Sequence, residues 1–436
     1  MNNLTILRGG ARLIALLLVF ALLGTAYGQD DKVQILYWDE ARSPVADVAI
    51  EQIIANFEEA NPDIDVVREV IAWEVLGDIA KSSIEAGEGP DIMTYDAGPA
   101  YAGILANAGL LLPLDEAYAA NNWDERLVSI SRAWTTFGGH VYGVGHELEA
   151  QGLYWNKRIF AEEELEVPAT FAELVELCGT LRERGYEAPM ALGWGNPHAF
   201  SLAHNWYNIL ANYVPVETVA AAISGEHPFS DPEIVASIEL VTTDMVDAGC
   251  YHDDAYAIGF LDGNNMHYAG ESPLMLMSTW AMQFFTDEIT DEFGFMILPP
   301  IEVRPQGMIH LMGSGWFIPA DTDHPEETIR FLDYLVSPET IQLWLDAGTL
   351  PAQAGVDYSP YEMRPVYRDF TTLVATWDGP LAYHLDVLTP ANWNTFVFES
   401  IGEIPAGRMT AQEFAEQMDV EMQKAVEEGR HADLTG

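Results

Sequence analysis

Basic residues are scarce in this sequence, and the shortage excludes a class of function. The chain has 19 lysines and arginines against 68 aspartates and glutamates, which gives a formal net charge of −49. A nucleic-acid-binding surface is excluded, because contacts to phosphate need clustered Lys and Arg side chains. A field of this sign also repels anionic ligands at a distance. The acidic residues are spread along the chain, so we expect a solvated acidic shell and a salty medium that screens its self-repulsion.

Cysteines and the common catalytic motifs are equally rare. Cys178 and Cys250 are the only cysteines, too few for a disulfide framework or a structural zinc site, and the sequence leaves open whether they pair. No GxSxG, HExxH, Walker or CxxC motif occurs. We therefore expect no cofactor and no bound metal, and the motifs favour a binding protein over an enzyme.

One long apolar run is present, and it lies at the N-terminus. Arg8 and Arg12 precede an apolar segment over residues 13–23, and Ala26 and Gly28 are small residues at the −3 and −1 positions of a cleavage site. This pattern predicts a signal peptide over residues 1–28 and a protein secreted across the cytoplasmic membrane. Because no cysteine follows the run, no lipid attachment is expected there.

Strand and helix patterns alternate in the remaining chain, which predicts an α/β fold. Buried-strand patterns occur at 32–38, 64–70, 91–96, 141–145, 148–156, 273–277, 294–298 and 315–318. Helical patterns occur at 50–60, 171–184, 231–248, 325–335 and 410–427. Open α/β sheets bind ligands at the carboxyl ends of their strands. Trp38, Glu40, Asp96 and Trp280 follow such strands and are candidate ligand contacts, although Trp38 could instead be core and the carboxylates could be solvated surface.

The chain resembles the extracellular solute-binding proteins of ABC importers, in particular the carbohydrate-binding branch that includes the maltose-binding proteins. The resemblance spans nearly the whole mature chain in the order of the family. It rests on FEEANPDIDV (57–66), GPDIMTYDAG (89–98), AGLLLPLDE (108–116), VYGVGHELEAQGLYWNKRIF (141–160), EVPATFAELVELCGTLRERG (166–185), MSTWAM (277–282), GSGWFIPADTDHPEETIRFLDYLVSPE (313–339) and GTLPA (348–352).

This resemblance implies a two-lobe periplasmic-binding-protein architecture with a ligand cleft between the lobes and several hinge crossings. The lobes would comprise residues 29–147 with 313–352, and residues 148–312 with 353–436. In HELEAQG, residues 146–152, alternation places Glu147, Glu149 and Gln151 on one face, which we expect to be wet and to look into the cleft. Glu149 matches a sugar-contacting glutamate of the maltose-binding members.

Further site candidates follow from the same resemblance, each with a structural alternative. Trp280 and Trp393 resemble aromatics that stack on sugar, although either could be core. Trp194 and His198 lie in a Gly/Pro-rich loop that could contact ligand or be ordinary surface. Gly313 and Trp316 could bring backbone close to a ligand or form a tight return between lobes. Arg42 could clamp a ligand or sit in an internal ion pair.

The function implied is capture of a neutral mono- or oligosaccharide, in the periplasm or at the cell surface, for the membrane permease of an ABC importer. We expect the protein to act as a monomer. The alternatives are a secreted glycoside hydrolase, which needs two carboxyls at a defined separation, and a receptor for a sugar phosphate or another small solute. Metal capture by His252, Asp253 and Asp254 is less favoured, because the histidines show no paired ligand spacing.

Overall fold

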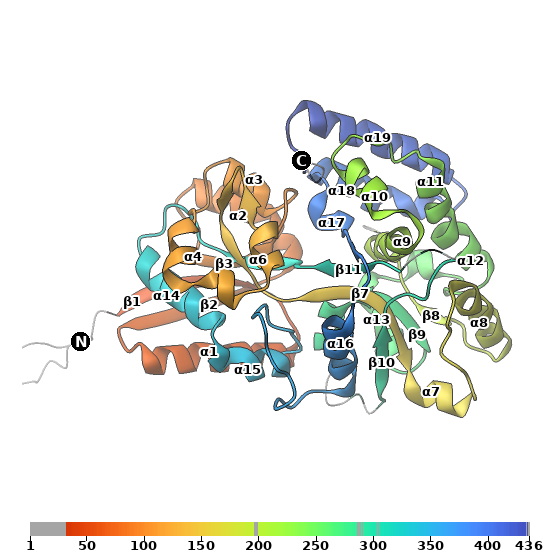
Figure 1. Ribbon diagram of the computed structural model, residues 1–436, viewed down its shortest axis with the longest axis horizontal. Helices are drawn as coiled ribbons and strands as arrows, with labels where there is room; N and C mark the ends of the chain where they lie inside the picture. The colour runs from red at the N-terminus through yellow and green to blue at the C-terminus, as the bar shows by residue number, and fades with distance from the viewer. Residues whose placement is uncertain are drawn as a thin grey trace, which may run out of the picture.

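The computed structural model describes residues 32–195, 199–285, 289, 291–302, 304, 306–432 and 434. The predicted signal peptide and His198 lie outside these residues. Figure 1 shows two α/β bodies side by side, one built around β1–β3 and the other around β7–β9. Within the described residues, no helix is long and apolar enough to cross a membrane.

The sheet of the first lobe has five strands in the order β2-β1-β3-β12-β6. Their bounds are β2 Ile64–Ile71, β1 Val33–Glu40, β3 Ile92–Asp96, β12 Ser314–Phe317 and β6 Gly143–Gly145. Strand β1 pairs in parallel with β2 and β3, whereas β12 runs antiparallel between β3 and β6. The carboxyl ends of β1 and β3 therefore meet at one edge of the sheet, as the alternating pattern predicts.

Helices α1 (Pro44–Ala60), α14 (Pro325–Leu335) and α15 (Ile341–Asp346) pack in this lobe (Figure 1). Helix α1 begins six residues earlier than the apolar periodicity predicts. The Ser43 side chain accepts a hydrogen bond from the Ala46 N–H, and Pro44 occupies the first turn, so the helix begins at its cap. The core beneath these helices contains Tyr37, Phe57, Trp316 and Phe331.

The sheet of the second lobe follows the order β13-β11-β7-β9-β8, and β10 also pairs with β7. Their bounds are β13 Leu381–Ala382, β11 Met308–Leu311, β7 Glu149–Asn156, β9 Leu274–Ser278, β8 Met190–Ala191 and β10 Phe293–Met296. Strand β7 is central, and seven of its eight residues are buried. The expectation of a wet face on this segment was therefore wrong, because Glu149 and Gln151 on that face are buried and their side chains bond to other parts of the protein.

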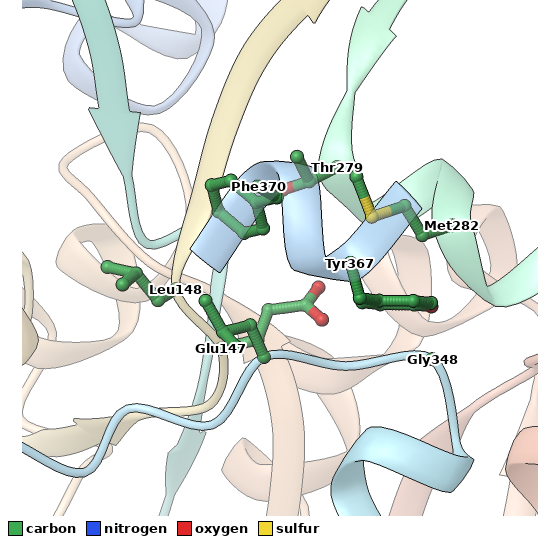
Figure 2. Close-up of a pocket in the computed structure, with 8 residues that line it drawn as sticks. Glu147, Leu148, Thr279, Met282, Gly348, Tyr367 and Phe370 are labelled. Carbon is green, nitrogen blue, oxygen red and sulfur yellow. The ribbon is translucent and has the colours of Figure 1, made fainter. Parts of the chain in front are cut away.

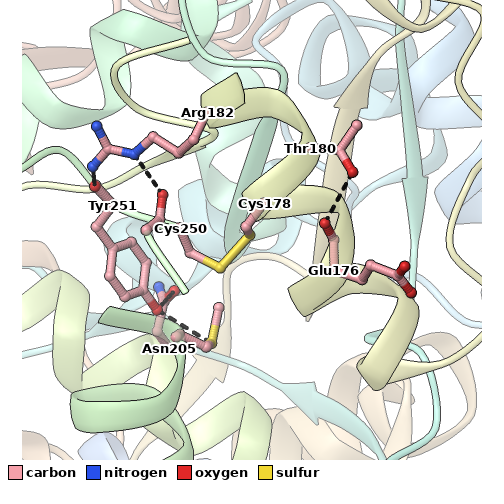
Figure 3. Close-up of a disulfide and its surroundings, with 9 residues drawn as sticks. Glu176, Cys178, Thr180, Arg182, Asn205, Cys250 and Tyr251 are labelled. Carbon is pink, nitrogen blue, oxygen red and sulfur yellow. Dashed lines mark hydrogen bonds between the residues drawn. A yellow bond between two sulfur atoms is a disulfide. The ribbon is translucent and has the colours of Figure 1, made fainter. Parts of the chain in front are cut away.

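Helices surround this second sheet: α8 (Phe171–Glu183), α9 (Phe200–Tyr213), α11 (Pro232–Glu239), α13 (Phe260–Tyr268), α16 (Pro365–Thr376), α18 (Ala391–Ser400) and α19 (Ala411–Glu427). The single helix expected over 231–248 is interrupted by a π-helical turn, Leu240–Asp244, before the short α12 (Met245–Asp247). A disulfide joins Cys178 in α8 to Cys250, next to Arg182, whose guanidinium donates to the Gly249 carbonyl (Figure 3). The open question of cysteine pairing is thereby answered.

The chain passes between the two sheets along three neighbouring segments. Residues 146–148 lead from β6 to β7, and residues 312–313 lead from β11 back to β12. The third segment runs from α15, which packs on α1, to α16, which packs on β10. A backbone bridge between Glu147 and Pro351 ties the first crossing to the third. Several short crossings of this kind suit a hinge between two rigid bodies.

Candidate functional site

The carboxyl end of β1 carries a buried ion-pair network. The Arg42 guanidinium lies 3.0 Å from the Glu40 carboxylate and 3.6 Å from that of Asp39, and its Nη2 lies 3.4 Å from His146 Nδ1. Burial raises the pKa of Glu40, while the charge of Arg42 opposes the shift. The Arg42 side chain is only 2% exposed, so the internal ion pair is the alternative that the structure supports.

Asp96, at the carboxyl end of β3, accepts a hydrogen bond from an exposed tryptophan. The Trp73 indole N–H, at the start of α2 (Trp73–Glu85), donates to Asp96 Oδ2 over 2.6 Å. Burial, with the charges of Glu40 and Asp386, raises the pKa of Asp96 well above its ordinary value. Trp73 is 43% exposed and was missed by the sequence analysis. It follows β2, so the rule that selected Trp38 and Asp96 would also have found it.

Glu149 lies where the chain enters the second lobe. Its Oε2 accepts a hydrogen bond from the Ser278 hydroxyl at 2.6 Å, and its Oε1 accepts one from the Gly313 N–H at 3.1 Å. Burial raises the pKa of Glu149 well above its ordinary value, and the charges of Glu147 and Asp96 act in the same direction. Glu149 thus joins the start of β7 to the second crossing, and it feels the charge of Asp96 of the other lobe.

Glu147 occupies the first crossing beneath α16. Figure 2 shows its carboxylate directed toward the Tyr367 ring, with Leu148, Thr279 and Gly348 around it. Burial raises the pKa of Glu147 to about 7, although Arg42 lowers it. We refer to Glu40, Asp96, Glu147 and Glu149 as the junction carboxyls, because they come from both lobes and from the crossing.

Two of the hydrogen bonds between the lobes lie outside the three crossings. The Tyr101 hydroxyl of the first lobe donates to Asp386 Oδ1 over 2.9 Å, and Asp386 lies in α17 (Leu385–Leu388). The Ser43 N–H donates to the Gln283 side-chain oxygen over 3.3 Å. Gln283 belongs to the 3-10 turn η3 (Thr279–Phe284), which also carries Trp280. The lobes are therefore in contact at two places besides the crossings.

Two of the predicted tryptophans have partly exposed rings. Trp280 packs against Phe260 and Phe284, with ring centroids 5.7 and 5.9 Å away. Trp194 packs edge-on against Tyr251 in the wall of a cavity of about 230 Å³, which Val246, His252, Tyr256 and Pro405 also line. Trp280 thus shares an element with the inter-lobe contact of Gln283, whereas Trp194 lies beside a separate cavity of the second lobe.

Three other tryptophans of the predicted site lie in cores. Trp38 is 6% exposed, and its indole donates to Glu69. Trp316 is fully buried, donates to the Tyr37 hydroxyl and packs against Trp344. Trp393 is fully buried and packs between Trp206 and Phe229. The expectation that Trp393 stacks on a ligand is therefore corrected, because its faces are occupied by other side chains. For Trp38 the structure supports the core alternative, and the Trp316 side chain is also part of a core.

Gly313 belongs to the crossing. Its N–H donates to Glu149, and its carbonyl accepts from the Ala97 N–H at 2.9 Å. Both backbone groups are therefore used within the protein, which supports the tight return between lobes. Among the described residues, no group of three or more His, Cys, Asp or Glu side chains is arranged to hold a metal ion.

Comparison with known proteins gives the family. The chain belongs to the bacterial extracellular solute-binding proteins, because the model of that family matches residues 52–365, well over half of the chain. The "Multiple sugar-binding protein" of Streptococcus mutans is 25% identical over 356 residues, which cover 78% of each chain.

Solved structures share the whole fold. A "Chitin oligosaccharide binding protein" superposes with a TM-score of 0.81 at 19% identity, over 91% of this chain and 99% of that one. The solute-binding protein RafE in complex with raffinose superposes with a TM-score of 0.72 at 21% identity, over 90% and 99%. These likenesses confirm the two-lobe architecture expected from the sequence.

Proposed function

We propose that this protein captures a neutral mono- or oligosaccharide between its lobes. The observation that carries the proposal is the meeting of carboxyl groups from both lobes, Asp96 and Glu149. Trp73 bonds to Asp96, and Trp280 follows two residues after Ser278, the partner of Glu149. A sugar offers hydroxyls that pair with carboxyl oxygens and apolar ring faces that pack on flat aromatics. The junction combines both kinds of group.

Charge supports a neutral ligand over a sugar phosphate. Four carboxyl groups lie at the junction, and the Arg42 guanidinium there is already paired with Glu40 and Asp39. A phosphate ester would meet a group of carboxyls there and no free guanidinium fork to balance its charge. The printed names of the streptococcal relative and of the two solved structures, which refer to sugars, chitin oligosaccharides and raffinose, agree with this class.

Delivery to the membrane permease of an ABC importer completes the proposal. Ligand capture would close the lobes about the three crossings, and the closed form would dock on the permease as a monomer. The proposed lobes are residues 29–147 with 313–352 and residues 148–312 with 353–436. Export across the cytoplasmic membrane, without a lipid anchor, belongs to the same proposal.

A thermal-shift screen of residues 29–436 tests the proposal. The probes are mono-, di- and trisaccharides, with sugar phosphates and divalent metals as controls. A ligand at 100 times its Kd should stabilise the fold by about 2.7 kcal/mol, and a bound sugar should be recovered intact. A shift with a phosphate ester or a metal, and with no sugar, would contradict the proposal, and cleavage of the sugar would favour a hydrolase.

Trp73→Ala then locates the site. Loss of an aromatic anchor should weaken sugar binding by about 1–4 kcal/mol, measured by calorimetric titration. Val420→Ala, at an exposed position of α19, is the control and should bind like the unaltered protein. Unchanged affinity in Trp73→Ala would show that the sugar does not bind at this end of the first sheet.

A further inference from the structure

A group of buried polar side chains lies beside the lobe junction, between α9 and the segment that leads into α17. His204, Tyr207, His384 and Asp386 form this group, which we call the α9 cluster. The His384 ring centroid lies 4.8 Å from that of His204 and 5.4 Å from that of Tyr207. Asp386 connects the cluster to the first lobe through the hydrogen bond from Tyr101. The cluster therefore borders the space between the lobes.

One half of the α9 cluster has protein partners for its polar atoms. His204 Nδ1 lies 3.2 Å from Gln151 Nε2, and His204 Nε2 lies 3.4 Å from Asp386 Oδ2. The Gln151 side-chain oxygen accepts in turn from Asn208 at 2.6 Å. This chain of bonds fixes the orientation of His204 and Asp386 and leaves them facing the other two members.

The other two members of the α9 cluster, Tyr207 and His384, have polar atoms without protein partners. Tyr207 is fully buried and His384 is 2% exposed. Within the described part of the chain, neither the Tyr207 hydroxyl nor either ring nitrogen of His384 has a hydrogen-bond partner. Buried polar groups are nearly always hydrogen-bonded, so three such atoms in one place indicate a bound molecule, either a water or a ligand, that supplies the missing bonds.

The chemistry of these atoms limits what that ligand is. Burial lowers the pKa of His384 to about 3, so its ring is neutral and offers one donor and one acceptor. The Tyr207 hydroxyl also donates and accepts. An ammonium group only donates, so it would leave the imidazole N–H unpaired. A carboxylate or phosphate would leave the ring acceptor unpaired and would also lie beside the negative charge of Asp386. A hydroxyl group, which donates and accepts, satisfies both.

We propose that Tyr207 and His384 bind neighbouring ring hydroxyls of the sugar, with Asp386 and His204 holding them in place. This inference rests on the proposed function and deepens it, because it assigns a polar subsite in the second lobe that complements the junction carboxyls. The two residues would select sugars with hydroxyls at both positions over analogues that lack one, because a missing hydroxyl leaves a buried group unpaired.

Tyr207→Phe tests the inference, because it removes only the hydroxyl. Tyr118→Phe is the matched control, since Tyr118 is an equally buried tyrosine whose hydroxyl donates to the Gly143 carbonyl. Calorimetric titration uses the tightest binder among maltotriose, raffinose and a chitin oligosaccharide, and urea unfolding reports stability. We expect Tyr207→Phe to raise Kd at least tenfold without loss of stability. Tyr118→Phe should lower stability and keep Kd.

His384→Leu provides the second variant, and monodeoxy analogues of the same sugar provide the second measurement. One of the monodeoxy analogues lacks the sugar hydroxyl that Tyr207 would bind. That analogue should bind the unaltered protein and Tyr207→Phe with the same Kd. Unchanged Kd in both variants, with tight binding by the unaltered protein, would overturn the inference and leave the proposed function standing. No binding of any probe by the unaltered protein would overturn both.

Discussion

Replacing Gly98 by alanine should weaken ligand binding by obstructing the contact between the lobes. Gly98 follows β3 in the first lobe at a φ of +85° and faces the backbone of Val387 in α17 of the second lobe. A Cβ atom at Gly98 would lie well inside 3.0 Å of the Val387 carbonyl oxygen, closer than real Cβ contacts come. The contact between the lobes, which we take to be the closed arrangement, would have to open at this point, and overpacking of this kind costs about 1–3 kcal/mol.

If ligand binding requires this closed arrangement, the cost appears as a loss of affinity. Converted to a dissociation constant, it corresponds to a Kd about 5- to 150-fold higher, measurable by calorimetric titration with the sugar found in the screen. Gly109→Ala is the control, because Gly109 has a φ of +71° and no atom within 4 Å of a built Cβ. It carries the same backbone strain without the clash. Equal affinities of the two variants would refute the reasoning.

Three further predictions concern stability. Because the pKa of Glu147 is about 7 in the folded protein and near 4.5 in the unfolded chain, the free energy of unfolding should fall by on the order of 3 kcal/mol as pH rises through this window. In Glu147→Gln the free energy of unfolding, measured by urea titration at several pH values, should fall less over this window. Glu226→Gln, at an exposed position, is the control, and the same pH dependence in both variants would contradict the prediction. Replacing Cys178 and Cys250 by serine should lower the free energy of unfolding by about 4 kcal/mol, given their separation of 72 residues, and unchanged urea midpoints would disprove a bridge. Trp316→Ala should lower the free energy of unfolding by about 3–5 kcal/mol in the same assay, as for a core tryptophan. A loss below 1 kcal/mol would contradict the core position of Trp316.

The acidic composition leads to one more prediction. With a net charge of −49, self-repulsion should be screened by salt, so Tm should rise between low and molar salt. Scanning calorimetry at several salt concentrations measures this, and a flat profile would show that the charges are spaced widely enough not to destabilise the fold.

The architecture was largely predictable from the sequence because its signals are local. The strands β1 and β3, the helix α19 and the crossing near Glu149 follow from periodicity, turn residues and the resemblance. Helix α9 was missed, because 11 of its 14 residues are buried and its polar residues lie inside, which removes the 3.6-residue pattern. The π-helical turn after α11 was missed because its sequence has no breaker.

The site was predictable only in part, for a different physical reason. Asp96 and Glu149 were selected because strand ends and a crossing have fixed positions in a two-lobe fold. Whether a tryptophan near such a position lies in the core or at the surface depends on tertiary packing, which leaves Trp73 43% exposed and buries Trp316. Tyr207 and His384 are about 180 residues apart in sequence and meet only through the packing of α9 against α17.

The place of β12 in the first sheet bears on the order in which the two lobes fold. This strand is inserted between β3 and β6, so the first 145 residues cannot close their own sheet. Residues 146–313, which include the strands β7 to β11 of the other lobe, are synthesised before β12. Contacts of such long sequence separation slow folding, so the first sheet is expected to form late. The second lobe, whose disulfide lies entirely within residues 178–250, is then free to acquire its cross-link before its neighbour is complete.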